Sequence, residues 1–121
     1  MIEKNEYQIN DCGVVLNPTT IWRWPDEGKE SLAWAFVKLT IGSDGEHWDF
    51  GYSLFSGGSP CTPYMRKFKT RAEAETAAIE WMKNHWLPRP DDLGIGNPKE
   101  VEKAKEAFRS WLSSKNQLSL F

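Results

Sequence analysis

Hydrophobic and polar side chains alternate most regularly between residues 32 and 54. When the pattern repeats every two residues, successive side chains lie on opposite faces of a β-strand. In residues 32–41 one face carries Ala33, Ala35, Val37, Leu39 and Ile41. In the following segment one face carries Trp48, Phe50, Tyr52 and Leu54. The Asp44-Gly45 pair between them is typical of a tight hairpin turn, so the pattern predicts two antiparallel strands.

A third strand is predicted at residues 64–68, after the break at Gly57-Gly58-Ser59-Pro60. Three strands in close succession favour an antiparallel meander. Upstream, residues 14–16 are a candidate for a short strand that ends at Asn17-Pro18. The aromatic residues 22–24 run into Pro25, and no element is assigned to them.

The sequence Thr70-Arg71-Ala72-Glu73 has the spacing of a capping box, in which Thr and Glu bond each other's backbone N–H groups. It predicts a helix that continues to about Trp86 and ends before Pro88. The apolar stripe of this helix consists of Ala74, Ala78, Trp81, Met82 and His85. The small alanines allow close approach to a sheet. The two strands offer alternative faces for this helix, and the aliphatic face of residues 32–41 is the more obvious partner.

A second helix is predicted from Asn97-Pro98-Lys99-Glu100, which supplies an N-cap, a first-turn proline and an acidic residue. Its apolar stripe consists of Val101, Ala104, Phe108, Trp111 and Leu112. The polar residues 113–116 are expected to separate it from the last five residues. The predicted fold is therefore α+β in the order β-β-β-α-α. It forms one globular domain over residues 1–114, followed by a flexible tail over residues 115–121.

Composition narrows the class of protein. A chain of 121 residues suits one domain, and 40% hydrophobic with 26% charged residues is usual for a soluble protein. The aromatic content of 13%, with seven tryptophans, is high, so most of these rings must lie in the core. A net charge of −2 argues against broad nonspecific binding of nucleic acid but leaves room for a local basic patch.

Few residues suggest chemistry. The two histidines, His47 and His85, lie in no metal-binding motif, and the acidic residues around His47 fit a hairpin turn. Cys12 and Cys61 are too far apart for a CxxC motif and are expected to be reduced thiols. No signal peptide or membrane-length apolar run is seen, which predicts a cytoplasmic protein. We expect no enzyme activity, metal or cofactor.

The last five residues are Gln117, Leu118, Ser119, Leu120 and Phe121, and they read QLSLF. In an extended peptide, the two leucines and the phenylalanine are expected to fill apolar pockets while the glutamine amide forms hydrogen bonds at their rim. An alternative is that the same apolar residues fold back onto the domain's own core.

This peptide resembles the motif, QL-[S/D]-L-F, by which bacterial replication and repair proteins bind the DNA polymerase sliding clamp. The match covers all five positions. The resemblance implies a non-enzymatic accessory protein of bacterial, phage or mobile-element DNA metabolism that docks on the clamp. Such a protein either assists clamp-dependent synthesis or inhibits it by occupying the groove that other clients use.

A second resemblance concerns residues 68–74, which read F-x-T-x-x-E-A. A meander followed by a helix with this opening is similar to AP2-type and integrase arm-binding domains, whose exposed sheet face enters the DNA major groove. An aromatic and basic sheet face also suits stacking with single strands. The candidate residues here are Trp34, Lys38, Arg66, Lys67, Lys69 and Arg71. The competing interpretation is that the basic residues are simply a solvated face.

Overall fold

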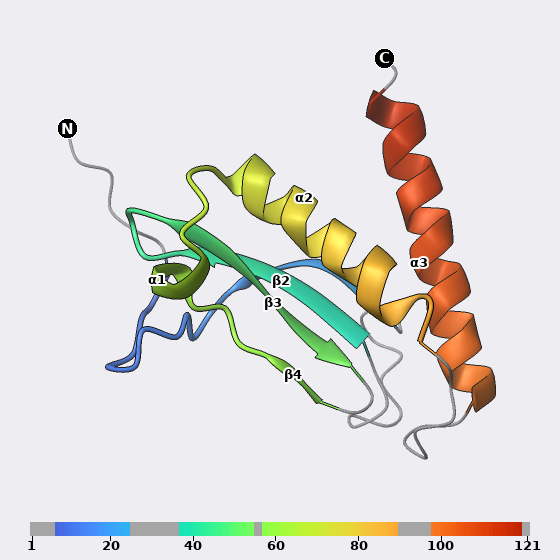
Figure 1. The fold of residues 1–121 in the computed structure, drawn as a ribbon, viewed down its shortest axis with the longest axis horizontal. Coiled ribbons are helices and arrows are strands. Elements are labelled where there is room, and N and C mark those ends of the chain that lie inside the picture. The colour runs from blue at the N-terminus through green and yellow to red at the C-terminus, as the bar shows by residue number, and fades with distance from the viewer. Residues whose placement is uncertain (1–6, 25–36, 55–56, 90–97, 120–121) are drawn as a thin grey trace.

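The computed structural model describes residues 7–24, 37–54, 57–89 and 98–119. They form an α+β fold in which four antiparallel strands make one sheet in the order β1-β2-β3-β4 (Figure 1). The strands are β1 (Thr19–Trp24), β2 (Val37–Ser43), β3 (Trp48–Leu54) and β4 (Gly57–Ser59). The helices are α1 (Pro63–Arg66), α2 (Arg71–Trp81), the π-helix η1 (Met82–Trp86) and α3 (Pro98–Ser119). Among these described helices, none is long and apolar enough to cross a membrane.

The predicted central hairpin is confirmed by the pairing of β2 with β3, in a register that runs from Lys38↔Ser53 to Ser43↔Trp48. The turn between them is held by the Asp44 carboxylate, which accepts hydrogen bonds from the backbone N–H groups of Glu46 and His47. Gly45 has a φ of 98°, a conformation that glycine adopts without strain. The Asp-Gly pair therefore supplies both the hydrogen-bond acceptor and the backbone freedom that the turn requires.

The third predicted strand, residues 64–68, is wrong. Pro63 opens the four-residue helix α1 instead, and Lys67 ends it in a left-handed conformation with a φ of 56°. Only Phe68 reaches the sheet, where it exchanges two backbone hydrogen bonds with Trp48. Proline suits the first turn of a helix because it lacks an N–H donor, and this local preference outweighs the apparent alternation that follows.

Two strands lie where no strand was predicted. The segment TTIWRW forms β1 and pairs with β2, with an irregularity in register between Thr20 and Trp22. Its β-branched and aromatic residues favour a strand, and Pro25 only follows its last residue. Gly57-Gly58-Ser59 forms β4 against β3, where a Cβ atom on Gly58 would overlap the Tyr52 carbonyl oxygen. The candidate strand at residues 14–16 contributes only an isolated bridge between Ile9 and Val15.

The core lies between one face of the sheet and the helices α2, η1 and α3 (Figure 1). Its buried members are Val37, Leu39, Phe50, Leu54, Ala78, Met82, Trp86, Ala104 and Phe108. The alternation predicted for β2 is confirmed, because Val37, Leu39 and Ile41 are all fully buried. The first long helix packs onto both strands of this face: Ala78 lies in the same buried cluster as Val37 and Leu39 of β2, and the Trp81 ring stacks on that of Tyr52 of β3.

The N-cap bond of the predicted capping box is confirmed, since the Glu73 backbone N–H donates to Thr70 Oγ1 at 3.1 Å. The Glu73 carboxylate accepts a hydrogen bond from the Thr70 hydroxyl at 3.5 Å. The helical segment ends at Trp86, as predicted, but its last turn is a π-helix closed by a hydrogen bond from Leu87 N–H to the Met82 carbonyl. This wider turn places Trp86 in the core and leaves His85 exposed, so the assignment of His85 to the buried stripe was wrong. Regular α-helical spacing cannot anticipate a π-turn.

Phe108 is fully buried, and its ring lies 5.0 Å from that of Trp22 and 5.8 Å from that of Trp86. We expect Phe108→Ala to lower the free energy of unfolding by about 3–5 kcal/mol, because it leaves a cavity where α3 meets the sheet. Urea unfolding measures the effect. Ser110→Ala, an exposed change on the same helix, is the control and should stay within about 0.5 kcal/mol. Similar values for both variants would mean that α3 does not hold the core together.

Candidate functional site

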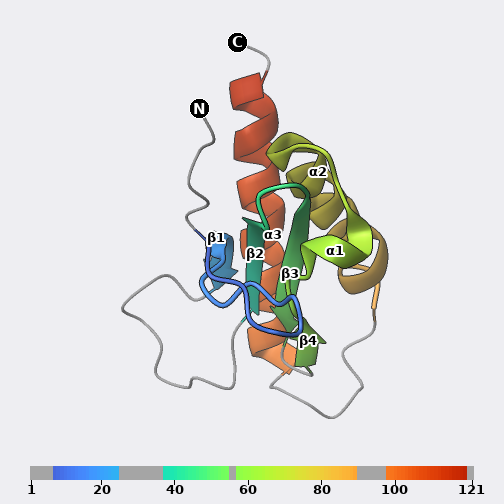
Figure 2. The same cartoon turned by 90° about the vertical axis from the view of Figure 1, so that its left-hand side faces the viewer.

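The C-terminal end of α3 carries the first part of the QLSLF peptide. Val101, Ala104 and Phe108 are buried, and the last packed residues, Trp111 and Leu112, are half-buried. Beyond them the helix extends past α2 and away from the sheet (Figures 1 and 2). The described part of the peptide thus begins on a projecting end of the helix rather than in the core.

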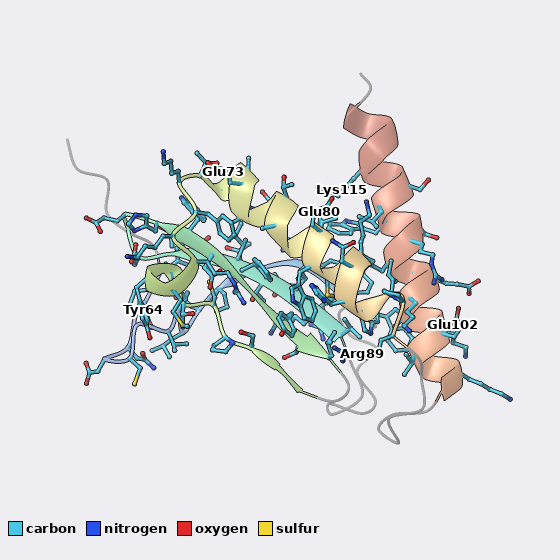
Figure 3. All side chains as sticks on the ribbon, viewed as in Figure 1. Tyr64, Glu73, Glu80, Arg89, Glu102 and Lys115 are labelled. Atoms are coloured by element: carbon cyan, nitrogen blue, oxygen red, sulfur yellow. The ribbon has the colours of Figure 1, made fainter. Side chains whose placement is uncertain are left out.

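Residues 113–116, predicted to be an irregular spacer, are helical, because α3 continues to Ser119. No glycine or proline interrupts this stretch. Lys115, on the upper half of α3 in Figure 3, places its Nζ atom 5.1 Å from the centre of the Trp111 ring one turn earlier. Such a contact between residues i and i+4 stabilises a further helical turn.

The backbone of Gln117, Leu118 and Ser119 lies in the last turn of α3, whereas Leu120 and Phe121 lie outside the described residues. A partner that binds the peptide in an extended form must unwind this turn. Terminal turns open at low cost because their carbonyl groups lack partners within the helix. The direction of α3 also does not favour the alternative in which the peptide covers the domain's own core.

The structure separates the predicted nucleic-acid residues. Lys38 lies near the start of β2, whereas Arg66, Lys67, Lys69 and Arg71 follow one another around α1 and the start of α2. That second group lies at the opposite end of the hairpin, because Phe68 bridges Trp48 and Trp48 pairs with the last residue of β2. Trp34 lies outside the described residues. The described members of the predicted nucleic-acid set therefore do not form one continuous basic and aromatic face.

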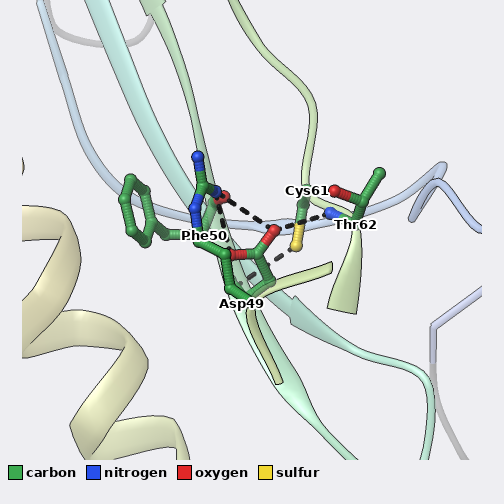
Figure 4. Close-up of polar contacts among 5 residues, drawn as sticks. Asp49, Phe50, Cys61 and Thr62 are labelled. Carbon is green, nitrogen blue, oxygen red and sulfur yellow. Dashed lines mark hydrogen bonds and ion pairs between the residues drawn. The ribbon is translucent and has the colours of Figure 1, made fainter. Parts of the chain in front are cut away.

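Arg66 is the most strongly engaged of these residues. Its Nη1 atom lies 3.0 Å and 3.3 Å from the two carboxylate oxygens of Asp49 and donates to the Phe50 carbonyl (Figure 4). Asp49 is fully buried on β3 and also accepts a hydrogen bond of 2.8 Å from the Thr62 backbone N–H. The pair thereby fastens α1 to β3. Arg71 is also paired, with Glu75 at 3.2 Å.

Cys61 lies beside this ion pair, and its thiol donates to the Asp49 carbonyl oxygen at 3.3 Å (Figure 4). Burial, followed by the negative charge of Asp49, raises the pKa of Cys61 to about 12. The thiol is therefore protonated at neutral pH, and thiolate chemistry at this position is suppressed. Cys12 is exposed, and both cysteines are free, in agreement with the prediction of two thiols.

The buried Asp49 was not found from the sequence. It lies on the polar side of an alternating strand, where an exposed residue is expected, and its partner Arg66 is 17 residues away. No local signal links the two positions. Within the described residues, no three His, Cys, Asp or Glu side chains gather as a metal site would require.

Comparison of the chain with models of protein families, with curated proteins and with solved structures finds no match. The assignment of a site therefore rests on the residues themselves. The QLSLF peptide and the basic surface both stay predictions, and two members of the basic surface, Arg66 and Arg71, form ion pairs.

The two paired arginines offer a matched test of the Asp49 site. We expect Arg66→Ala to lower the free energy of unfolding by about 2–3 kcal/mol, because it leaves a buried carboxylate without its cation. Arg71→Ala removes an exposed ion pair and should cost no more than about 0.5 kcal/mol. Urea unfolding compares the two. Adding Asp49→Asn to Arg66→Ala should recover part of the loss, since a neutral amide leaves no buried charge. Equal small effects for both arginines would contradict the assigned role of Asp49.

The two thiols should differ in reactivity. Because its pKa is raised to about 12, Cys61 stays protonated at pH 8, so only Cys12 should react with iodoacetamide in the folded protein at that pH. Mass spectrometry of the modified protein gives the stoichiometry and the position. Unfolding in urea should expose Cys61 and add a second modification. Rapid labelling of Cys61 in the native protein would show that its environment is open.

Proposed function

We propose that this chain is a non-enzymatic accessory protein of bacterial, phage or mobile-element DNA metabolism. It docks on the DNA polymerase sliding clamp in the cytoplasm through Gln117, Leu118, Ser119, Leu120 and Phe121. The observation that carries the proposal is the five-residue match of QLSLF to the clamp-binding motif. The position of its first residues, beyond the last packed turn of α3, supports it.

The energetics are consistent with a reversible contact. Leu118, Leu120 and Phe121 each contribute about 1.5–3 kcal/mol when fully buried. Ordering the peptide, including the opening of the last turn of α3, takes back about 2–5 kcal/mol. The balance favours a dissociation constant of about micromolar rather than picomolar. A ring-shaped clamp with repeated sites does not require a tighter peptide, because neighbouring sites raise the effective concentration.

The helix α3 gives the peptide a fixed base. It is anchored in the core by Phe108 and Ala104, while Ser113 and Ser114 are exposed beyond the packed region. A partner can therefore approach the end of α3 without displacing a core residue. Binding is expected to leave the sheet and the packing of α2 unchanged.

Two consequences of docking remain as hypotheses that share this contact. The protein either brings its globular domain to the replication machinery or excludes other clients from the clamp. Clamp-dependent DNA synthesis in the presence of the protein separates them. An inhibitor lowers the rate at saturating protein, and the peptide variant described next abolishes that effect.

The peptide itself is tested by Leu120→Ala/Phe121→Ala. This double change removes about 3–6 kcal/mol of apolar burial from a micromolar contact, so binding to an isolated bacterial clamp should fall below detection in surface plasmon resonance. Thermal stability should stay within about 0.5 kcal/mol. Ser113→Ala/Ser114→Ala, two exposed positions on the same helix, is the matched control and should bind normally. Ser119→Asp should also bind, since the motif accepts either residue. A destabilised double variant with unchanged clamp binding would contradict the proposal.

A further inference from the structure

A hollow of about 170 Å³ lies on the sheet face opposite α2 and α3. It forms because two segments, residues 13–18 and residues 58–61, cross this face, with the former in blue in front of the sheet in Figure 2. They are tied together by a hydrogen bond from Val15 N–H to the Cys61 carbonyl. Val15 packs over Gly42, and the Ser59 carbonyl lies over Gly51. The neighbouring part of the face, around Lys38 and Ser53, remains open as the hollow.

Within the described part of the chain, the polar side chains that line this hollow and have no hydrogen-bond or ion-pair partner include Lys38, Thr40 and Ser53. Thr40 is only 7% exposed. Lys38 and Ser53 are directly opposed in the register of β2 and β3, and Thr40 follows two residues after Lys38 on the same face. Among the described residues, the Thr40 oxygen is not one of the enclosed side-chain atoms that lack a partner, so it is open to the hollow, where a ligand or a water molecule can bind it.

The charge and polarity of the lining narrow the kind of ligand. Among the described residues of the lining, Lys38 is the only charged one and none is a carboxylate. Arg23 is the partner of Lys38 in the register of β1 and β2, so it adds a second cation beside the hollow on the same face. The thiol of Cys61, also in the lining, is neutral because burial raises its pKa to about 12. Val15, Pro18 and Pro60 supply apolar walls. Positive charge beside apolar walls matches an anion that has a short apolar body.

We propose that this hollow is a binding site for a small organic carboxylate. The Lys38 ammonium and the Thr40 hydroxyl bind the carboxylate oxygens of the ligand. Ser53, opposite Lys38 on β3, adds a third polar side chain beside them. The apolar part of the ligand packs against Val15, Pro18 and Pro60. The volume resembles that of protein cavities that bind a benzene-sized molecule, so the ligand is limited to a few carbon atoms beyond its carboxylate. This site is independent of the peptide at the end of α3 and gives Lys38 a role other than contact with nucleic acid.

The proposal is tested with acetate, butyrate and benzoate as probes and inorganic phosphate as a comparison, using amide chemical shifts of the full chain in NMR. We expect saturable shifts at β2 and β3, with a dissociation constant of about 1 mM for the best probe. Each added methylene should raise affinity by up to about fourfold because it reaches the apolar walls. Phosphate, which lacks an apolar body, should bind more weakly than butyrate.

Variants of the two carboxylate-binding residues complete the test. Lys38→Met and Thr40→Val should each weaken butyrate binding by about tenfold or more, because each removes a hydrogen-bond donor to a charged group. Lys69→Met, which removes one exposed lysine outside the hollow, is the matched control and should bind as the unaltered protein does. Thr40→Val should not lower the melting temperature, because the threonine hydroxyl has no intramolecular hydrogen bond to lose. A folded variant that no longer binds therefore supports a ligand site.

Three results would overturn the proposal. The first is the absence of saturable shifts with every probe, which means that the hollow holds only water. The second is equal binding by Lys38→Met, Thr40→Val and the control, which means that the probes bind elsewhere. The third is stronger binding of phosphate than of butyrate, which means that the apolar walls do not contribute.

Discussion

The structure depends on the contact between the aliphatic face of β2 and the helices that cover it. Val37 and Leu39 are fully buried there, and the small side chain of Ala78 lets α2 approach the sheet closely. Phe108 brings α3 to the same surface. Burial of apolar area is the dominant favourable contribution to folding. The remaining elements are placed relative to this contact: β1 and β3 flank β2, and α3 is held so that its far end projects.

The opposite face of the sheet is organised by polar contacts instead. Asp49 lies on that face, and its ion pair with Arg66 and hydrogen bond from Thr62 fasten the connection after β4 to β3. This arrangement brings the chain around Cys61 across Gly51, where a side chain would collide with it. The part of the sheet that this chain segment covers, and the hollow beside it, both result from the contacts of Asp49 with Arg66 and Thr62. A buried carboxylate thus shapes the surface on which Lys38 and Thr40 are left without partners among the described residues.

The two proposed sites use different parts of this framework. The clamp-binding peptide requires an end of α3 that is not packed, and the core contact at Phe108 provides a fixed base for it. The proposed binding site for an organic carboxylate requires that Lys38 and Thr40 are held in fixed positions, and the paired strands β2 and β3 hold them. Because the two sites lie on different elements, each can be disrupted without the other. Their separate tests therefore give independent answers about function.

The sequence by itself determined the elements whose signals are local. The alternation in β2 and β3, the Asp44-Gly45 turn, the helix N-cap at Thr70 and the apolar stripe of α3 were all predicted and are observed. The QLSLF motif is equally a local pattern, which is why a partner can be proposed from five residues. These features are readable because each depends on neighbours within a few positions along the chain.

Only the tertiary structure decided the features that depend on distant residues. The edge strand β4 exists because glycines can lie against β3, and the π-turn that buries Trp86 rather than His85 depends on packing against α3. Asp49 and Arg66 meet across 17 positions, and the hollow near Lys38 requires two separate segments to cross the sheet. Such contacts leave no periodic signal, because chain folding rather than sequence spacing brings their members together. For that reason the sequence could not show that Arg66 pairs with a buried carboxylate or that Lys38 lies beside a hollow.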